Sequence, residues 1–72
     1  MYELDYFANN VGAAILYKES RGGFSIERRI QKQPGIYKCR VYNCPDMDGA
    51  MRRFGVMKRT LAAMQTRREK RK

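Results

Sequence analysis

The segment DMDGAMRRFGVMKRTLAAM, residues 46–64, has the clearest periodicity in this chain of 72 residues. Its regularly spaced apolar residues are Met47, Ala50, Phe54, Met57, Leu61 and Met64. Successive members of this set are three or four residues apart, which predicts an amphipathic helix with a single apolar stripe. Asp46 is expected to cap the first turn, because its carboxylate can accept hydrogen bonds from free backbone N–H groups. Gly55, in the middle of the segment, costs about 1 kcal/mol relative to alanine and indicates either a close contact or a kink.

Three short segments before this helix are predicted to form strands. Residues 13–18 are a short apolar run, and residues 24–30 alternate between apolar and polar side chains, with the period of a half-buried strand. Residues 37–42 show the same alternation. Turn-forming residues at 21–23 (Arg-Gly-Gly) and 33–35 (Gln-Pro-Gly) separate the three segments, which predicts an antiparallel meander.

The N-terminal residues 2–11 are ambiguous. Leu4, Phe7 and Val11 lie at helical spacing, which favours a short helix that ends before Gly12. The expected fold class is therefore α+β: a three-stranded antiparallel meander packed against one long C-terminal amphipathic helix, with a short N-terminal helix as an optional addition. Residues 1–66 are expected to form a single small domain, and residues 67–72 a basic, solvated tail.

Charge is the strongest functional signal in the sequence. Sixteen Lys and Arg residues against seven Asp and Glu residues give a formal net charge of +9. Residues 1–27 carry −2, from two basic and four acidic residues, whereas residues 28–72 carry +11, from fourteen basic and three acidic residues. Repulsion among so many like charges destabilises the folded state. The uneven charge indicates a polyanionic partner, either nucleic acid or an acidic protein surface.

The residue types needed for catalysis and metal binding are scarce. The chain has no histidine, the commonest general base near neutral pH. Its two cysteines, Cys39 and Cys44, are too few for a structural zinc site. We therefore expect no enzyme activity, no cofactor and no metal, with both cysteines reduced. The acidic start of the chain is unlike a signal peptide, and the longest apolar run, residues 13–17, is too short to span a bilayer. A cytoplasmic location without a membrane partner is expected.

The alternation of the strands predicts a basic face on the sheet. In residues 24–30 the apolar phase is expected to face the helix, so that Arg29 points away from it. In residues 37–42 the phase of Tyr37, Cys39 and Val41 is expected to face the helix. The open face would then carry Arg29, Lys38, Arg40 and Tyr42. Basic groups beside an exposed aromatic ring suit a phosphate backbone with a base stacked nearby, although an ordinary solvated sheet face explains the pattern equally well.

The predicted helix and tail carry two further basic groups. Arg52, Arg53, Lys58 and Arg59 lie off the apolar stripe, and the tail adds Arg67 and Arg68. No acidic residue occurs between Asp48 and Glu69, whereas ordinary solvated helices mix both signs of charge. The predicted nucleic-acid-binding residues are therefore Arg29, Lys38, Arg40, Tyr42, Arg52, Arg53, Lys58, Arg59, Arg67 and Arg68.

The leading hypothesis is a small accessory protein that binds DNA or RNA by contacting the phosphate backbone through the basic sheet face, the helix and the tail. Such contacts give affinity more readily than sequence specificity. The alternative is a small inhibitor or adaptor, of a kind that a phage or plasmid encodes, that docks on an acidic surface of a larger protein such as a nucleic-acid-processing enzyme. The alternative predicts hot spots among exposed Tyr, Phe, Met and Arg side chains. A homodimer through a strand edge or the helix stripe is a further option.

Overall fold

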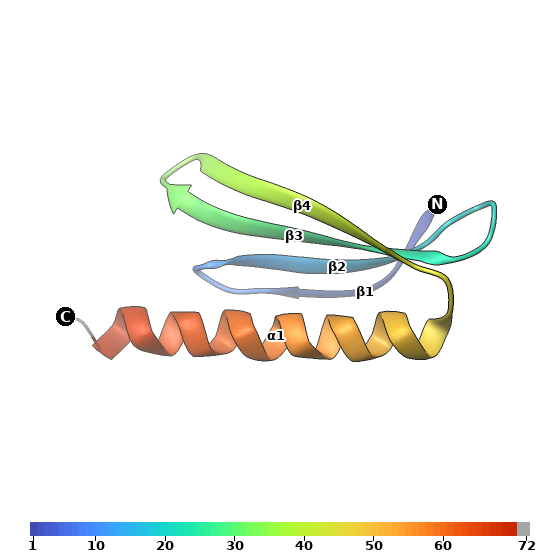
Figure 1. The fold of residues 1–72 in the computed structure, drawn as a ribbon. Helices are drawn as coiled ribbons and strands as arrows, with labels where there is room; N and C mark the ends of the chain where they lie inside the picture. Colours follow the sequence, from blue (N-terminus) through green and yellow to red (C-terminus); the bar gives the residue numbers. More distant parts are fainter. Residues whose placement is uncertain (71–72) are drawn as a thin grey trace.

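The chain forms an antiparallel sheet of four strands in the order β1-β2-β3-β4, with one long helix across one face (Figure 1). The computed structural model describes residues 1–70. The strands are β1 (Tyr2–Ala8), β2 (Gly12–Lys18), β3 (Phe24–Gln33) and β4 (Ile36–Cys44), and the helix α1 spans Met47–Lys70. The predicted α+β class, with a meander packed on a C-terminal helix, is confirmed, and the sheet has one strand more than expected.

The N-terminal segment is a strand, so the short helix considered for residues 2–11 is wrong. β1 pairs with β2 in antiparallel register, with Phe7 opposite Ala14, and a bulge interrupts the pairing between Glu3 and Asp5. Pairing prevails over the helical spacing because it gives the N–H and C=O groups along the edge of β2 their backbone partners. Tyrosine and phenylalanine, which are frequent in this segment, also fit a pleated surface well.

Both predicted turns are present, and both use glycine at positive φ. Gly22 (φ 97°) and Gly23 (φ 80°) lie between β2 and β3, and Gly35 (φ 82°) lies between β3 and β4. Glycine adopts this left-handed region at little cost because it has no Cβ. β3 is longer than predicted, and the tip of the β3–β4 hairpin rises away from α1 (Figure 1).

The core lies between α1 and the face of the sheet that looks toward it, here called the helix face. Ala14 and Leu16 of β2 and Ile26 of β3 pack there against the helix stripe. The buried stripe residues are Ala50, Phe54, Met57 and Leu61. Asp46 caps the helix as predicted, because its Oδ1 accepts a hydrogen bond from the Gly49 amide at 2.7 Å. Among the helices in residues 1–70, none combines the length and the apolar character that crossing a bilayer requires.

The register of β4 reverses the face that the sequence predicted for its residues. Directly opposed residues of an antiparallel pair share a face. Tyr42 is opposite Ile26 and Cys44 is opposite Phe24, and all four belong to the core or pack against it. Apolar side chains occur in both phases of β4, so alternation alone does not decide its orientation. The orientation is decided by the junction with α1 shortly after Cys44, because this junction brings the end of β4 onto the core.

The same register separates the basic residues that were assigned to one open face. Arg40 is opposite Arg28, and both lie on the helix face together with Lys38. Arg29 is opposite Cys39 on the other side of the sheet, here called the outer face. The prediction that Arg29, Lys38, Arg40 and Tyr42 share one outward face is therefore wrong.

Candidate nucleic-acid interface

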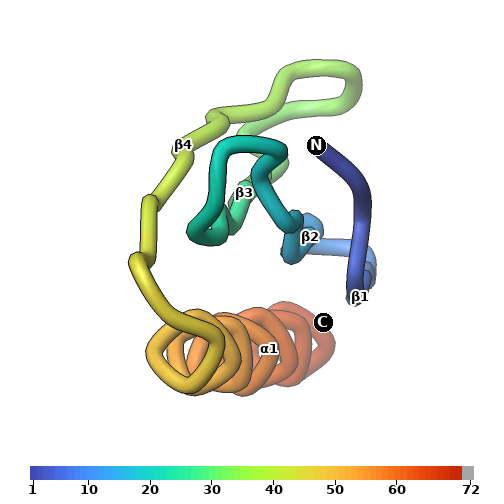
Figure 2. Tube along the Cα trace, turned by 90° about the vertical axis from the view of Figure 1, so that its right-hand side faces the viewer, coloured from blue at the N-terminus to red at the C-terminus, as the bar shows by residue number. Residues whose placement is uncertain are grey.

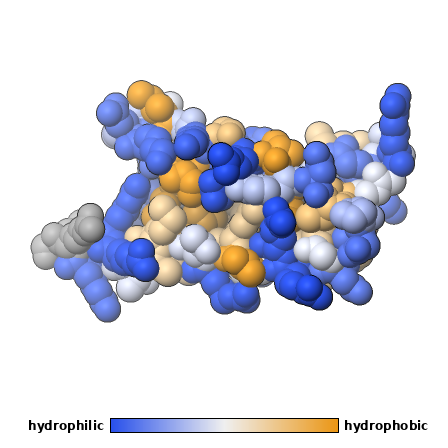
Figure 3. Space-filling model, viewed as in Figure 1, coloured by the Kyte–Doolittle hydropathy of each residue, from blue (hydrophilic) through white to orange (hydrophobic). Residues whose placement is uncertain are grey.

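A groove runs between α1 and the part of the sheet formed by β3 and β4, with a volume of about 460 Å³. Its apolar lining residues are Ile30, Val56, Met57, Leu61 and Met64, its basic ones are Arg28, Lys32 and Arg53, and Tyr42 and Thr60 complete it. We call it the basic groove. In the space-filling view, pale and orange side chains occupy the band between sheet and helix, flanked by blue ones (Figure 3). None of the residues within 1–70 that line the groove is acidic.

The two walls of the basic groove come from different elements. Arg28 and Ile30 are alternate residues of β3 and share the helix face. Lys32, where the pairing with β4 is irregular, also lines the groove. Arg53 and Val56 lie on the flank of α1 beside its apolar stripe. Viewed along the helix, β4 rises away from α1 at the side of the molecule (Figure 2), and this divergence keeps the groove open.

Tyr42 lies where the two walls meet. The Cζ atom of Arg28 is 5.9 Å from the centre of the Tyr42 ring, and the Cζ atom of Arg53 is 5.0 Å from it, within the range of cation–π interactions. A side-chain hydrogen bond with Arg40, helped by the charges of Arg28 and Arg53, lowers the pKa of the Tyr42 phenol. Arginines from β3, β4 and α1 therefore converge on one aromatic ring.

The positive charge of the basic groove has no ion-pair partner within residues 1–70. In this part of the chain the one ion pair joins Arg29 Nε to Glu27 Oε2 at 2.6 Å, on the outer face. Its hydrogen bond to Glu27, together with the charge of that carboxylate, raises the pKa of Arg29. The groove arginines lack such compensation and repel one another, so an anion that enters the groove relieves this repulsion.

The other predicted helix residues lie outside the basic groove. The Nζ atom of Lys58 is 5.2 Å from the centre of the Phe54 ring, on the far flank of α1. Arg52 and Arg59 are exposed and seven residues apart, about two turns, so they share the solvent face of the helix. Arg53 is the member of this group that lines the groove.

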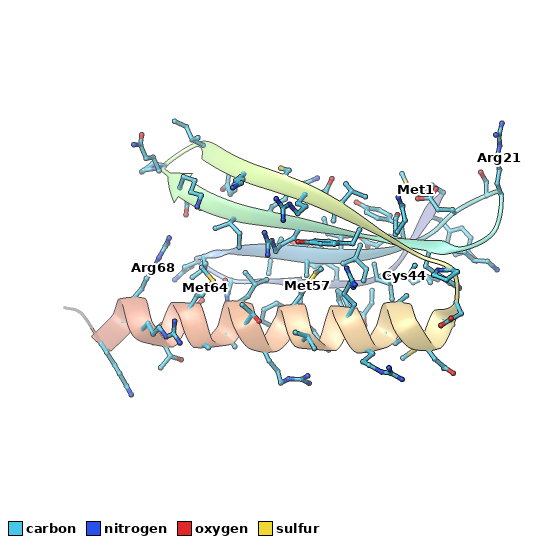
Figure 4. All side chains as sticks on the ribbon, viewed as in Figure 1. Met1, Arg21, Cys44, Met57, Met64 and Arg68 are labelled. Carbon is cyan, nitrogen blue, oxygen red and sulfur yellow. The ribbon has the colours of Figure 1, made fainter. Side chains whose placement is uncertain are left out.

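The C-terminal basic residues are arranged around the end of α1. The helix continues to Lys70, so residues 67–70, which were expected in a solvated tail, are helical. Arg67 is exposed, whereas Arg68 Nη2 donates a hydrogen bond to the Gln31 carbonyl oxygen at 3.2 Å and points from the helix toward the sheet (Figure 4). The rest of the predicted tail, residues 71–72, lies outside the described residues.

Two residues of the basic groove, Arg28 and Lys32, were missed by sequence reasoning. Arg28 had a usable signal, because it occupies the same alternation phase as the buried Ile26. A cation in an otherwise apolar phase marks a place where the core opens to solvent. Lys32 had no such signal, since it lies beyond the predicted strand of residues 24–30.

Groups suited to redox chemistry or metal binding are few among residues 1–70. Both cysteines are free; Cys44 is buried and Cys39 is exposed on the outer face. Within residues 1–70 no group of three His, Cys, Asp or Glu side chains is placed to hold a metal ion. Neither a protein-family model nor a curated protein nor a solved structure matches the chain.

Proposed function

We propose that this protein binds nucleic acid through the phosphate backbone, with the basic groove as the principal contact. The observation that supports this most is the convergence of Arg28, Arg40 and Arg53 on Tyr42 without an ion-pair partner among residues 1–70. A guanidinium group binds phosphate through a planar fork of N–H donors. The guanidinium carbons of Arg28 and Arg53 lie 5.9 and 5.0 Å from the centre of the Tyr42 ring, so both groups are held near one place where a phosphate can meet them.

The spread of charge favours a polymer over a small anion. Basic side chains continue beyond the groove along α1, at Arg52 and Arg67, and the 24 residues of the helix extend over about 36 Å. A small anion uses one of these positions, whereas a phosphate chain uses several and releases counterions from each. Contacts of this kind supply affinity with little base specificity. The proposal includes a cytoplasmic location, where nucleic acid is accessible.

Fluorescence anisotropy with labelled DNA and RNA oligonucleotides, at about 50 and 200 mM salt, tests the proposal. Arg28→Gln/Arg53→Gln removes two charges from the basic groove. The matched control Arg21→Gln/Arg59→Gln removes two charges from the β2–β3 turn and the solvent face of α1. We expect the groove variant to bind about tenfold or more weakly and to lower the slope of log affinity against log salt by about two, with much smaller changes in the control.

Two outcomes contradict the proposal: weak binding of the wild-type protein to every oligonucleotide at the lower salt concentration, and equal losses in the two variants. Arg28 and Arg53 also lose their contacts with Tyr42 when they are replaced. Circular dichroism spectra and melting curves of both variants therefore accompany the binding measurements, so that a loss of affinity is assigned to charge and not to unfolding.

The exposed edge of β4 favours a second candidate function, an inhibitor or adaptor that docks on an acidic protein surface. β4 is one edge of the sheet, and Ile36, Tyr37 and Val41 on it are all more than half exposed. An edge strand can accept a strand from a partner, and Lys38 and Arg40 would then meet acidic side chains. A strand edge, of β4 or of β1, is the route that remains for a homodimer, because the sheet covers the helix stripe. Failure of the wild-type protein to bind any oligonucleotide favours this candidate.

A further inference from the structure

The basic groove continues toward the start of α1. A second, more open hollow, bordered by Pro45, Gly49 and Arg52, shares Arg53 and Val56 with the basic groove. From Gly49 to Met64 the two hollows follow one flank of α1 for about 22 Å. The two hollows adjoin at these shared residues and together are called the furrow, which is long enough for several units of a polymer.

The floor of this furrow is apolar and open to solvent. Val56 is 48% exposed, and Ile30 and Met64 are half-buried. Phosphate groups and sugars gain little from contact with such side chains. A charged or polar group placed against them loses its water and receives no hydrogen bond in return. A ligand that fills the furrow therefore presents apolar surface to the floor and negative charge to the rim.

The guanidinium groups of Arg28 and Arg53 define the rim. Both lie over the Tyr42 ring, at 5.9 and 5.0 Å from its centre, so the ring faces these cations. Tyr42 thus acts as a support that positions two cations beside the apolar floor, and the guanidinium planes are themselves surfaces on which bases stack.

A single nucleic-acid strand presents both surfaces that the furrow requires, and a duplex does not. In a duplex the base faces are stacked on one another, whereas an unpaired strand exposes them to side chains. Resting on the function proposed above, we propose that the furrow binds single-stranded nucleic acid in preference to a duplex. Phosphates lie on Arg28, Lys32 and Arg53, bases lie against Val56 and Met64, and the site holds about four nucleotides, the lower end for small single-strand-binding folds.

The test compares single strands and duplexes of the same sequence, about 12 nucleotides long so that they exceed one site. Val56→Gln/Met64→Gln makes the floor polar without changing charge. Met47→Gln/Met51→Gln is the matched control, because both methionines are exposed on α1 and lie outside the furrow. We expect the wild-type protein to bind the single strand about tenfold more tightly than the duplex. The floor variant should lose about tenfold in single-strand affinity, with an unchanged salt slope and unchanged duplex binding.

The outcomes separate this inference from the proposed function. Equal affinity for single strand and duplex, with both reduced in Arg28→Gln/Arg53→Gln, supports phosphate binding but overturns the single-strand preference. An absence of binding to either form overturns both. Unchanged single-strand affinity in a folded Val56→Gln/Met64→Gln variant also overturns the inference. If that variant melts at a lower temperature, Val56→Gln alone, at an exposed position, provides the same test with a smaller expected loss.

Discussion

Tyr42 and Tyr17 are the same residue type in opposite electrostatic surroundings. The hydrogen bond with Arg40 and the charges of the two groove arginines lower the pKa of Tyr42 below its ordinary value of 10.0. Burial, together with the charge of Glu27, raises the pKa of Tyr17, which lies on the outer face opposite Ser25. The charge of Arg29 acts in the other direction on Tyr17 but is outweighed by burial and by Glu27, so the pKa values of Tyr42 and Tyr17 move apart.

Tyr42→Phe is expected to remove a tyrosine that ionises below the ordinary pKa of 10.0. Between the lowered pKa of Tyr42 and 10.0 the unfolded state binds more protons, so in the wild-type protein this residue makes the free energy of unfolding rise with pH. The contribution is lost as the pH falls through the lowered pKa. Tyrosinate absorbance and urea unfolding at several alkaline pH values measure both effects. Tyr17→Phe, the control, should instead remove a tyrosine that ionises above 10.0. If the absorbance change below 10.0 is the same in Tyr42→Phe as in the wild-type protein, the arginines do not lower the pKa of this ring.

At the scale of the elements, two glycines show opposite constraints. A Cβ atom on Gly12, at the start of β2, would collide with the backbone carbonyl of Arg29 and lie 3.1 Å from the Ile30 Cα. On Gly55 it would lie 3.7 Å from Arg59 Nη1, an ordinary contact, and α1 shows no kink along its length (Figure 1). Gly55 therefore marks neither of the features that its place in the sequence indicated, a close contact or a kink.

Gly12→Ala is expected to lower the free energy of unfolding by about 1–3 kcal/mol, because β2 and β3 must separate to admit the methyl group. Gly55→Ala is expected to raise it by about 0.5–1 kcal/mol, because alanine restricts the unfolded chain and favours the helix. Urea unfolding followed by circular dichroism measures both, and each variant serves as the other's control. A Gly12→Ala protein as stable as the wild type would mean that the two strands lie further apart than described.

The elements differ in how far the sequence determines them. The helix was predictable because one stripe of its surface holds the spaced apolar residues, and that stripe is the one the sheet buries. β4 has apolar residues in both phases, so its orientation depends on pairing with β3 and on the junction with α1. β1 depends on pairing with β2, which its own residues do not encode. The position of the basic groove depends on which face of β4 meets the helix. The sequence therefore predicted which residue types would bind nucleic acid but placed Tyr42 on the wrong face of the sheet.

On the scale of the whole molecule, charge is divided between its surfaces. The chain is elongated, with extents of 45 × 23 × 14 Å, and the strongly basic residues 28–72 include most of β3, all of β4 and α1. The groove between these elements concentrates cations, whereas the outer face holds the Glu27–Arg29 ion pair. Folding therefore brings cations together without ion-pair partners among residues 1–70. Their repulsion destabilises the folded state, as is expected of a polyanion-binding surface that is empty.

Salt is accordingly expected to stabilise the free protein. Raising the ionic strength from about 20 to about 200 mM shortens the screening length to below about 10 Å and weakens the repulsion among the groove cations. Each 1 kcal/mol of repulsion that is relieved raises the melting temperature of a domain of this size by about 4–8 °C, so thermal melts at the two salt concentrations measure the effect. Arg28→Gln/Arg53→Gln should be less sensitive to salt than Arg21→Gln/Arg59→Gln, although both variants lose the same charge, because the first pair lies close to Tyr42 and Arg40. A melting temperature that falls as salt is added would instead mean that attractive ion pairs hold the fold together, and that the basic groove is not under electrostatic strain.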